Sequence, residues 1–428
     1  MSPPPASLHH FTLANGLKVY LREDHRAPLV SAQLWYHVGA SHERDGQTGL
    51  SHMLEHLMFE GSSKLAPGEY SALMTRIGAA PNAFTVDDAT VYPLTLPANR
   101  LEIALEAMAD AMASATLEAA PFDRELKVVM AERRSQVDNY PLALALERHN
   151  SLAHGSSPYA NPVIGHLADL QRLTPAAARS WYQDWYHPNN ATLAVAGAVS
   201  LERLQTLVSR HFTTIPTQPL PASEHPRADA GLSRRSLAIR QRGLREGLLM
   251  SFNVPSAATA ANPQMAPALS LIPDLLAKGT SARLKQQLLH KENLLQALSC
   301  RYDPLKRGDS LLSFYAFTNA EATTPDAVTQ RILDALAELG QTPPEAHELA
   351  RAKARLLARQ VFAQDDIAEQ AHAIGQRAAS GLDPTLMGTE LQALQAVTAE
   401  QVRQAAAQYL HEARMTTTLM HGQENPDD

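Results

Sequence analysis

The pentapeptide His52-Met53-Leu54-Glu55-His56 is the most informative stretch of this chain, because it brings two imidazoles and a carboxylate together. In an α-helix, residues four positions apart lie about 40° apart around the axis, so His52 and His56 can point at one ion. Neutral imidazole is a preferred zinc ligand, and a carboxylate such as Glu55 can take a proton from water that zinc activates. The pattern therefore favours a zinc site over the alternative, two surface histidines on an amphipathic helix.

A catalytic zinc usually has three protein ligands and one position open for water. Glu132 is the candidate third ligand, in a segment at 122–134 that carries acidic residues early and basic residues late, as helices do. Glu125 precedes it by about two helical turns and faces the same way. One of these carboxylates can bind zinc while the other orients a ligand from behind, unless both lie on a solvated helical face.

The order His-x-x-Glu-His, followed farther along by Glu-x6-Glu, resembles the pitrilysin family of inverzincin zinc metallopeptidases. The likeness is close over residues 8–215 and looser over 230–425. Several flanking segments also fit the family, at 48–51, 57–62, 82–92, 162–165 and 185–190.

The resemblance implies that His52, His56 and Glu132 bind Zn²⁺ and that Glu55 is the general base. It further implies that Glu125 is the carboxylate behind the ligands. The reaction would then be metal-assisted peptide hydrolysis, with Glu55 passing the proton of the attacking water to the leaving amine.

The resemblance also gives a role to the segment that contains Asn82, Ala83 and Phe84. It would form an edge strand that pairs with the backbone of a peptide substrate, because an exposed edge offers unpaired N–H and C=O groups to an extended chain. Without the zinc motif, Asn82 would be interpreted as a turn residue after 78–81.

One feature departs from the family pattern. Self-sufficient members carry an Arg and a Tyr in the second half, and Leu289 and Gln296 stand at the matching positions here. Leucine cannot donate a hydrogen bond and glutamine lacks the phenol, and losing one oxyanion donor costs on the order of 10²–10³ in turnover. A shifted loop that brings Arg301 or Tyr302 into this role is the alternative.

The chain thus resembles the zinc-bearing subunit of bacterial heterodimeric members and the beta subunit of mitochondrial processing peptidase. We predict a zinc-dependent endopeptidase that cleaves peptides or unfolded segments, with a homologous partner subunit that supplies the Arg/Tyr pair. The alternatives are a self-sufficient homodimeric peptidase and a non-catalytic assembly subunit.

The length of 428 residues fits two domains of about 200 residues each. Strand and helix patterns mix without strict alternation, which predicts an α+β fold with two similar domains, each a mostly antiparallel sheet flanked by helices. We expect a zinc-binding domain at 1–215, a proline-rich linker at 216–230, and a structural copy without a metal site at 231–428.

Composition narrows the range of partners and compartments. The net charge of −7 and the interrupted arginine run at 234–245 give no reason to expect nucleic acid. Cys300 is the single cysteine, which excludes an internal disulfide. The chain has no apolar run long enough to span a membrane, and its start at 1–7 lacks the features of a signal peptide. We expect a soluble protein, with the cytoplasm and the periplasm both open.

Overall fold

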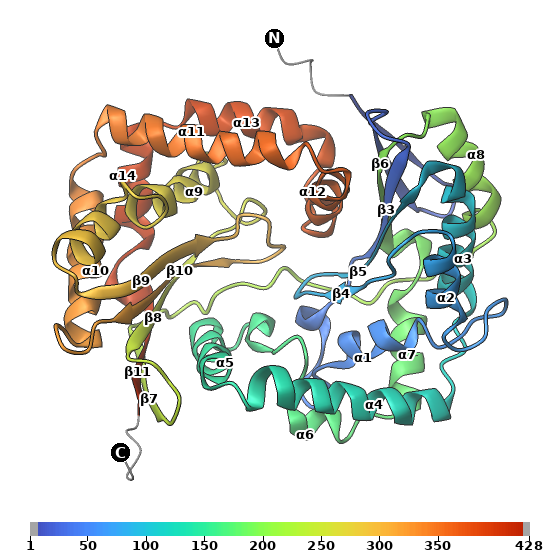
Figure 1. Cartoon of the computed structure of the whole chain (residues 1–428), viewed down its shortest axis with the longest axis horizontal. Helices are drawn as coiled ribbons and strands as arrows, with labels where there is room; N and C mark the ends of the chain where they lie inside the picture. Colours follow the sequence, from blue (N-terminus) through green and yellow to red (C-terminus); the bar gives the residue numbers. More distant parts are fainter. Residues whose placement is uncertain (1–6, 423–428) are drawn as a thin grey trace. The chain divides into compact units, whose positions relative to one another are not determined.

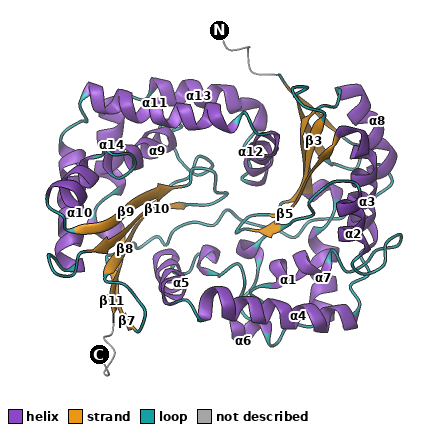
Figure 2. Cartoon of the chain, viewed as in Figure 1, coloured by secondary structure: helices purple, strands orange, loops and turns teal. Residues whose placement is uncertain are grey.

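The computed structural model describes residues 7–422, so most of the segment at 1–7, where the sequence predicts no signal peptide, lies outside the described residues. The chain forms two compact units, each built from three stretches of sequence (Figure 1). The first contains the chain up to Arg133, Asn161–Glu224 and Phe362–Thr385. The second contains Arg134–Ala160, His225–Val361 and the chain from Leu386 onward. The predicted α+β class is confirmed, with one sheet and its helices in each unit (Figure 2).

The sheet of the first unit has six strands in the order β1-β2-β6-β3-β5-β4. Only the β2–β6 pair is parallel. The Asn15-Gly16 turn joins β1 to β2, and β4 lies at the edge. The strands are β1 Leu8–Thr12, β2 Lys18–Glu23, β3 Leu29–Tyr36, β4 Phe84–Thr85, β5 Thr90–Pro97 and β6 Ala191–Gly197.

The sheet of the second unit repeats this topology without a counterpart of β1. Its order is β7-β11-β8-β10-β9, and again only one pair, β7–β11, is parallel. The strands β7, β11, β8, β10 and β9 therefore correspond in turn to β2, β6, β3, β5 and β4. The strands are β7 Arg235–Gln241, β8 Gly247–Val254, β9 Leu295–Tyr302, β10 Ser310–Thr318 and β11 Met415–Gly422.

Helices cover both sheets. Those of the first unit are α1 Leu50–Leu57, α2 Glu69–Arg76, α3 Leu101–Ser114, α4 Ala119–Arg133, α6 Leu167–Leu170, α7 Pro175–Trp185, α8 Leu201–Phe212 and α12 Ile367–Ala379. The others are α5 Pro141–His154, α9 Met265–Leu276, α10 Pro325–Gln341, α11 Ala346–Ala363, α13 Met387–Ala396 and α14 Ala399–Tyr409. Thr398 caps α14, because its hydroxyl accepts a hydrogen bond from the backbone N–H of Gln401. None of the helices within residues 7–422 combines the length and the apolar character needed to cross a bilayer.

Helices α5 and α12 each belong to one unit, whereas the chain segments before and after them belong to the other unit. α12 packs on β2, β3 and β6, while α5 packs on the corresponding strands β7, β8 and β11. Gly375 allows α12 to approach the first sheet closely, because a Cβ atom there would lie 2.1 Å from Trp35 Nε1. The sequence predicts two contiguous domains, whereas each unit includes one helix from the half of the chain that mainly forms the other unit.

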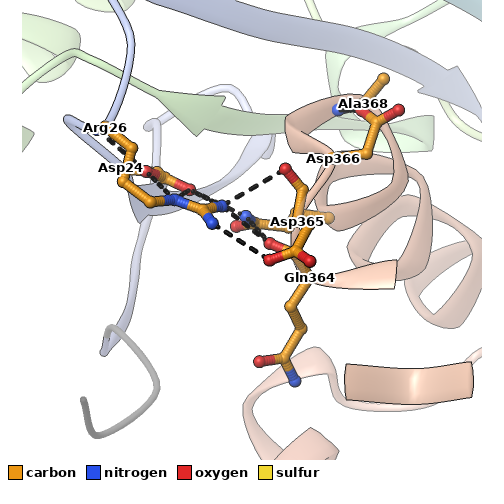
Figure 3. Close-up of polar contacts among 7 residues, drawn as sticks. Asp24, Arg26, Gln364, Asp365, Asp366 and Ala368 are labelled. Atoms are coloured by element: carbon orange, nitrogen blue, oxygen red, sulfur yellow. Dashed lines mark hydrogen bonds and ion pairs between the residues drawn. The ribbon is translucent and has the colours of Figure 1, made fainter. Parts of the chain in front are cut away.

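Polar contacts fix the start of α12 to the first sheet (Figure 3). Arg26 pairs with Asp24 at 2.6 Å and with Asp365 at 3.2 Å, and it donates to the carbonyl oxygen of Gln364 at 2.9 Å. Asp366 caps the helix by accepting a hydrogen bond from the backbone N–H of Ala368 at 2.7 Å. A segment distant in sequence is thereby anchored beside the turn that follows β2.

Candidate metal centre

The pentapeptide lies in helix α1, as its spacing predicts. The apolar residues of this helix, Leu50, Met53, Leu54 and Leu57, are buried in the core of the first unit. Gly49 precedes the helix with φ +87°, a left-handed conformation that a glycine adopts without strain. Burial of the apolar residues leaves both histidines to face α4.

The donor atoms of three side chains converge between α1 and α4. His52 Nε2 lies 3.7 Å from Glu132 Oε2, and His56 Nε2 lies 3.6 Å from the same oxygen. One ligand atom from each of the three residues lies within 4.8 Å of the other two. Across residues 7–422 this is the only such group of three or more His, Cys, Asp or Glu side chains.

The donor set and its spacing fit a zinc ion. Two imidazoles and one carboxylate form a ligand set of catalytic zinc sites, and ligands of a tetrahedral zinc lie about 3.3 Å apart at ordinary bond lengths. The separations from Glu132 Oε2 are slightly longer than that value and longer than direct hydrogen bonds. His52 Nδ1 is buried, and no group among the described residues bonds it, so its Nε2 is the nitrogen that faces the cluster.

The two histidines lie in different surroundings. The His52 side chain is 12% exposed, and this burial, reinforced by the neighbouring His56, lowers the pKa of His52 to about 4. The imidazole of His52 is therefore neutral at pH 7, the form that binds metal. His56 Nδ1 lies 3.2 Å from Glu125 Oε2, a contact that orients the ring from behind.

Glu55 lies beside this cluster and is 8% exposed. Its Oε2 accepts a hydrogen bond of 2.6 Å from the hydroxyl of Thr85 in β4. Burial raises the pKa of Glu55, and the charge of Glu132 acts in the same direction, while the Thr85 bond and His56 oppose the shift. A carboxylate with a raised pKa, held at a fixed place, suits proton transfer near neutral pH.

Strand β4 is shorter than the segment expected from the resemblance. Phe84 is its first residue, whereas Asn82 and Ala83 precede the strand. The Phe84 ring lies against Trp35 and His372, with centroids 6.0 and 5.8 Å away. Phe84 and Thr85 therefore form the edge of the sheet, with the Thr85 side chain directed at Glu55.

The second unit has neither a guanidinium nor a phenol at the positions where the resemblance expects them. Leu289 packs against the apolar core, and Gln296 is the second residue of β9, where it is exposed and accepts a hydrogen bond from Arg245. The two alternative residues are engaged elsewhere. Tyr302 donates its hydroxyl hydrogen to the Pro255 carbonyl at 2.7 Å, and Arg301 lies 6.0 Å from the Tyr315 ring centroid.

Thr85 and Glu43 lie near the candidate metal centre and make contacts that the sequence did not predict. Thr85 is part of the segment that resembles the family, but its bond to Glu55 depends on the folding of β4 against α1. Glu43 accepts hydrogen bonds from the backbone of Gly49 and Ser51 at the start of α1. Gly49 is the residue just before the helix and Glu43 lies six positions earlier, so no local capping pattern points to Glu43.

Two copies of one α+β topology, one of which holds a converging His, His and Glu set, define a two-domain metallopeptidase-like fold. The Insulinase (Peptidase family M16) model matches residues 18–166, and the Peptidase M16 inactive domain model matches residues 172–356. The chain belongs to peptidase family M16, the insulinase and pitrilysin family, and the resemblance inferred from the sequence is confirmed.

Several relatives are called zinc proteases. Zinc protease PqqE of Helicobacter pylori is 29% identical over 350 residues, which cover 80% of this chain and 77% of that protein. The beta subunit of the mitochondrial-processing peptidase of Lentinula edodes is 25% identical over 210 residues, 49% of this chain and 45% of that one.

Solved structures share the fold. A protease from Helicobacter pylori has a TM-score of 0.90 at 24% identity, covering 98% of this chain and 100% of that one. The periplasmic protease PqqL from Escherichia coli has a TM-score of 0.82 at 19% identity and covers 99% of this chain. The match spans 49% of PqqL, so the chain has about half the length of that relative.

Proposed function

We propose that this chain is the catalytic subunit of a zinc-dependent endopeptidase that cleaves peptides or unfolded segments. The observation that carries the proposal is the convergence of His52, His56 and Glu132 beside the buried carboxylate of Glu55. When bound, zinc would activate a water molecule and polarise the carbonyl of the scissile bond.

The residues of the site divide the remaining work. His52, His56 and Glu132 hold the metal, and Glu125 keeps the His56 ring in the orientation for binding. Glu55 accepts the proton of the attacking water and delivers it to the leaving amine, so it must be deprotonated first and protonated later. Thr85 keeps the Glu55 carboxylate in place for both transfers.

The substrate would bind as an extended strand along β4. An edge strand offers backbone groups to any extended peptide, so the pairing tolerates many side chains and favours unfolded segments. Phe84 would give this edge an aromatic surface, and Asn82 and Ala83 would extend the contact beyond the strand.

A homologous partner subunit would supply the Arg/Tyr pair. This part of the proposal is supported by Leu289 and Gln296, neither of which offers a guanidinium or a phenol. It is also supported by relatives such as PqqL, of which this chain matches only half the length.

One observation favours a self-sufficient peptidase instead. Arg245 donates a hydrogen bond to Gln296 and lies over the Phe317 ring, 4.6 Å from its centroid. The guanidinium of Arg245 thus lies beside Gln296, although Arg245 does not belong to β9. In this second reading, Arg245 takes the place of the arginine that position 289 lacks.

Hydrolysis of a mixed fluorogenic peptide library by the purified, zinc-loaded chain tests both readings, with Glu55→Gln as the control. Bound zinc without cleavage supports the subunit that needs a partner. Cleavage that disappears in Glu55→Gln and in Arg245→Ala supports the self-sufficient peptidase. A chain purified without chelators that contains no zinc contradicts both and favours an assembly subunit.

A further inference from the structure

Glu43 is a buried acidic residue that the proposed chemistry does not use. It follows a short 3-10 turn, Ala40–His42, and is only 6% exposed. Both of its carboxylate oxygens accept backbone hydrogen bonds, Oε2 from Gly49 at 2.8 Å and Oε1 from Ser51 at 2.6 Å. Because a buried carboxylate is costly unless it is well bonded, such a position requires an explanation.

The two donors explain which element depends on Glu43. The first N–H groups of a helix have no partner within the helix, and a side-chain oxygen at the preceding residue usually accepts from them. The residue before α1 is Gly49, which has no side chain to do this. Glu43 caps the helix from outside, and one of its donors, Ser51, directly precedes His52.

The 3-10 turn that precedes Glu43 is also bonded to the β4–β5 hairpin. Ala40 N–H donates to the Val86 carbonyl at 3.2 Å, and Ser41 N–H donates to the Asp87 carbonyl at 2.8 Å. The Ser41 hydroxyl donates to Asp88 Oδ1 at 2.8 Å. Val86 directly follows Thr85, the residue that holds Glu55.

These contacts form a closed circuit. Glu43 accepts a hydrogen bond from the start of α1, and Glu55 of the same helix accepts one from Thr85 in β4. Val86, which follows Thr85 in the chain, accepts one from the turn that precedes Glu43. We propose that Glu43 is a positioning residue for the metal centre, which fixes His52 and Glu55 relative to the strand that holds the Glu55 carboxylate. The proposal rests on the proposed zinc site, and it adds a residue that touches neither the metal nor the substrate.

Zinc affinity of the whole chain, measured by competition with a chelator, tests this role without depending on activity. Glu43→Gln places an N–H₂ group against one of the two backbone donors and should weaken zinc binding about 10- to 100-fold, as losses behind metal ligands do. Turnover per zinc-loaded molecule, measured with the partner subunit present if the chain alone does not cleave, should fall by a similar factor with little change in KM. The matched control is Glu69→Gln, because exposed Glu69 accepts one backbone hydrogen bond, from Ala66 at 2.8 Å, at the start of α2.

Wild-type zinc affinity in folded Glu43→Gln overturns the proposal, even if the variant melts at a lower temperature. If Glu43→Gln does not fold, Glu43→Asp decides, because it keeps the charge but is too short to reach both donors. An intermediate loss of zinc affinity in Glu43→Asp supports the role, and an unchanged affinity overturns it. A wild-type chain that binds no zinc removes the proposed function as well, which separates the two failures.

Discussion

Thr85 donates its hydroxyl hydrogen to Oε2 of Glu55 at 2.6 Å, so the edge strand of the first sheet holds a carboxylate of helix α1 in place. The alternation of side chains along β4 explains this contact, since neighbouring residues of a strand point to opposite faces. Phe84 packs toward Trp35, and Thr85 consequently points toward α1. The strand proposed to bind the substrate is therefore also the one that orients the proposed base.

Loss of this hydrogen bond should slow the reaction. We expect Thr85→Val, which keeps the shape of the side chain, to lower kcat by about tenfold to a hundredfold, since hydrogen bonds to charged groups contribute about 1.5–3 kcal/mol. Zinc content should not change. Steady-state kinetics, with the partner subunit present if the chain alone does not cleave, checks this. Thr206→Val on α8 is the control, because the exposed Thr206 hydroxyl donates to the Glu202 carbonyl away from the site. An unchanged kcat in Thr85→Val would show that Glu55 is positioned by other contacts.

Glu125 should affect metal binding without being a ligand. Glu125→Ala removes the carboxylate that contacts His56 Nδ1, and we expect zinc affinity to fall about 10- to 100-fold. Glu132→Ala, which removes a ligand, should abolish stoichiometric binding. Chelator competition measures both variants, and equal losses in the two would contradict the division of roles.

Gly375 should be intolerant of a larger residue. A Cβ atom at this position would overlap the Trp35 ring, so Gly375→Ala should reduce the free energy of unfolding by about 1–3 kcal/mol or more. Gly388 in α13 has no atom within 4 Å of its Cβ position, and Gly388→Ala should be neutral or stabilising. Urea denaturation compares the two variants, and equal stabilities would mean that α12 does not pack on Trp35 in solution.

Stability should fall in mild acid because of a histidine in the second unit. His149 is buried between Ser251 and Thr418, at 2.6 and 2.9 Å, and burial lowers its pKa to about 3. The unfolded state takes up a proton below about pH 6.5 while the folded state does not. The unfolding free energy attributable to this residue is thus complete above pH 6.5 and is lost toward pH 3, by about 1.4 kcal/mol per pH unit.

Urea denaturation between pH 7 and pH 4 measures this slope. His149→Gln cannot take up the proton, so its stability should depend less steeply on pH than that of the wild type, although the variant is less stable overall. Identical slopes would assign the acid sensitivity to other groups.

Much of the fold was predictable because local patterns determine it. The Asn15-Gly16 hairpin and the cap at Thr398 depend on short-range chemistry. Helical spacing also places His52 and His56 on one face of α1, whereas the role of Glu132 as the third ligand was implied by the resemblance to the family.

The remaining features depend on tertiary contacts that no local pattern encodes. The exchange of α5 and α12 between units follows from which sheet each helix packs on, and neither helix carries a distinctive sequence for that choice. Asn82 and Ala83 were expected in the edge strand, but pairing with β5 begins only at Phe84. Glu43 caps a helix whose first residue lies well beyond it in the chain.

The metal content of the purified chain tests the central claim most directly. We predict one zinc per chain by elemental analysis of protein prepared without chelators, the same content in Glu55→Gln, and none in His56→Ala. This outcome would show that His56 binds the metal and that Glu55 does not. Absence of zinc from the wild type, or full zinc in His56→Ala, would contradict the assignment of the site.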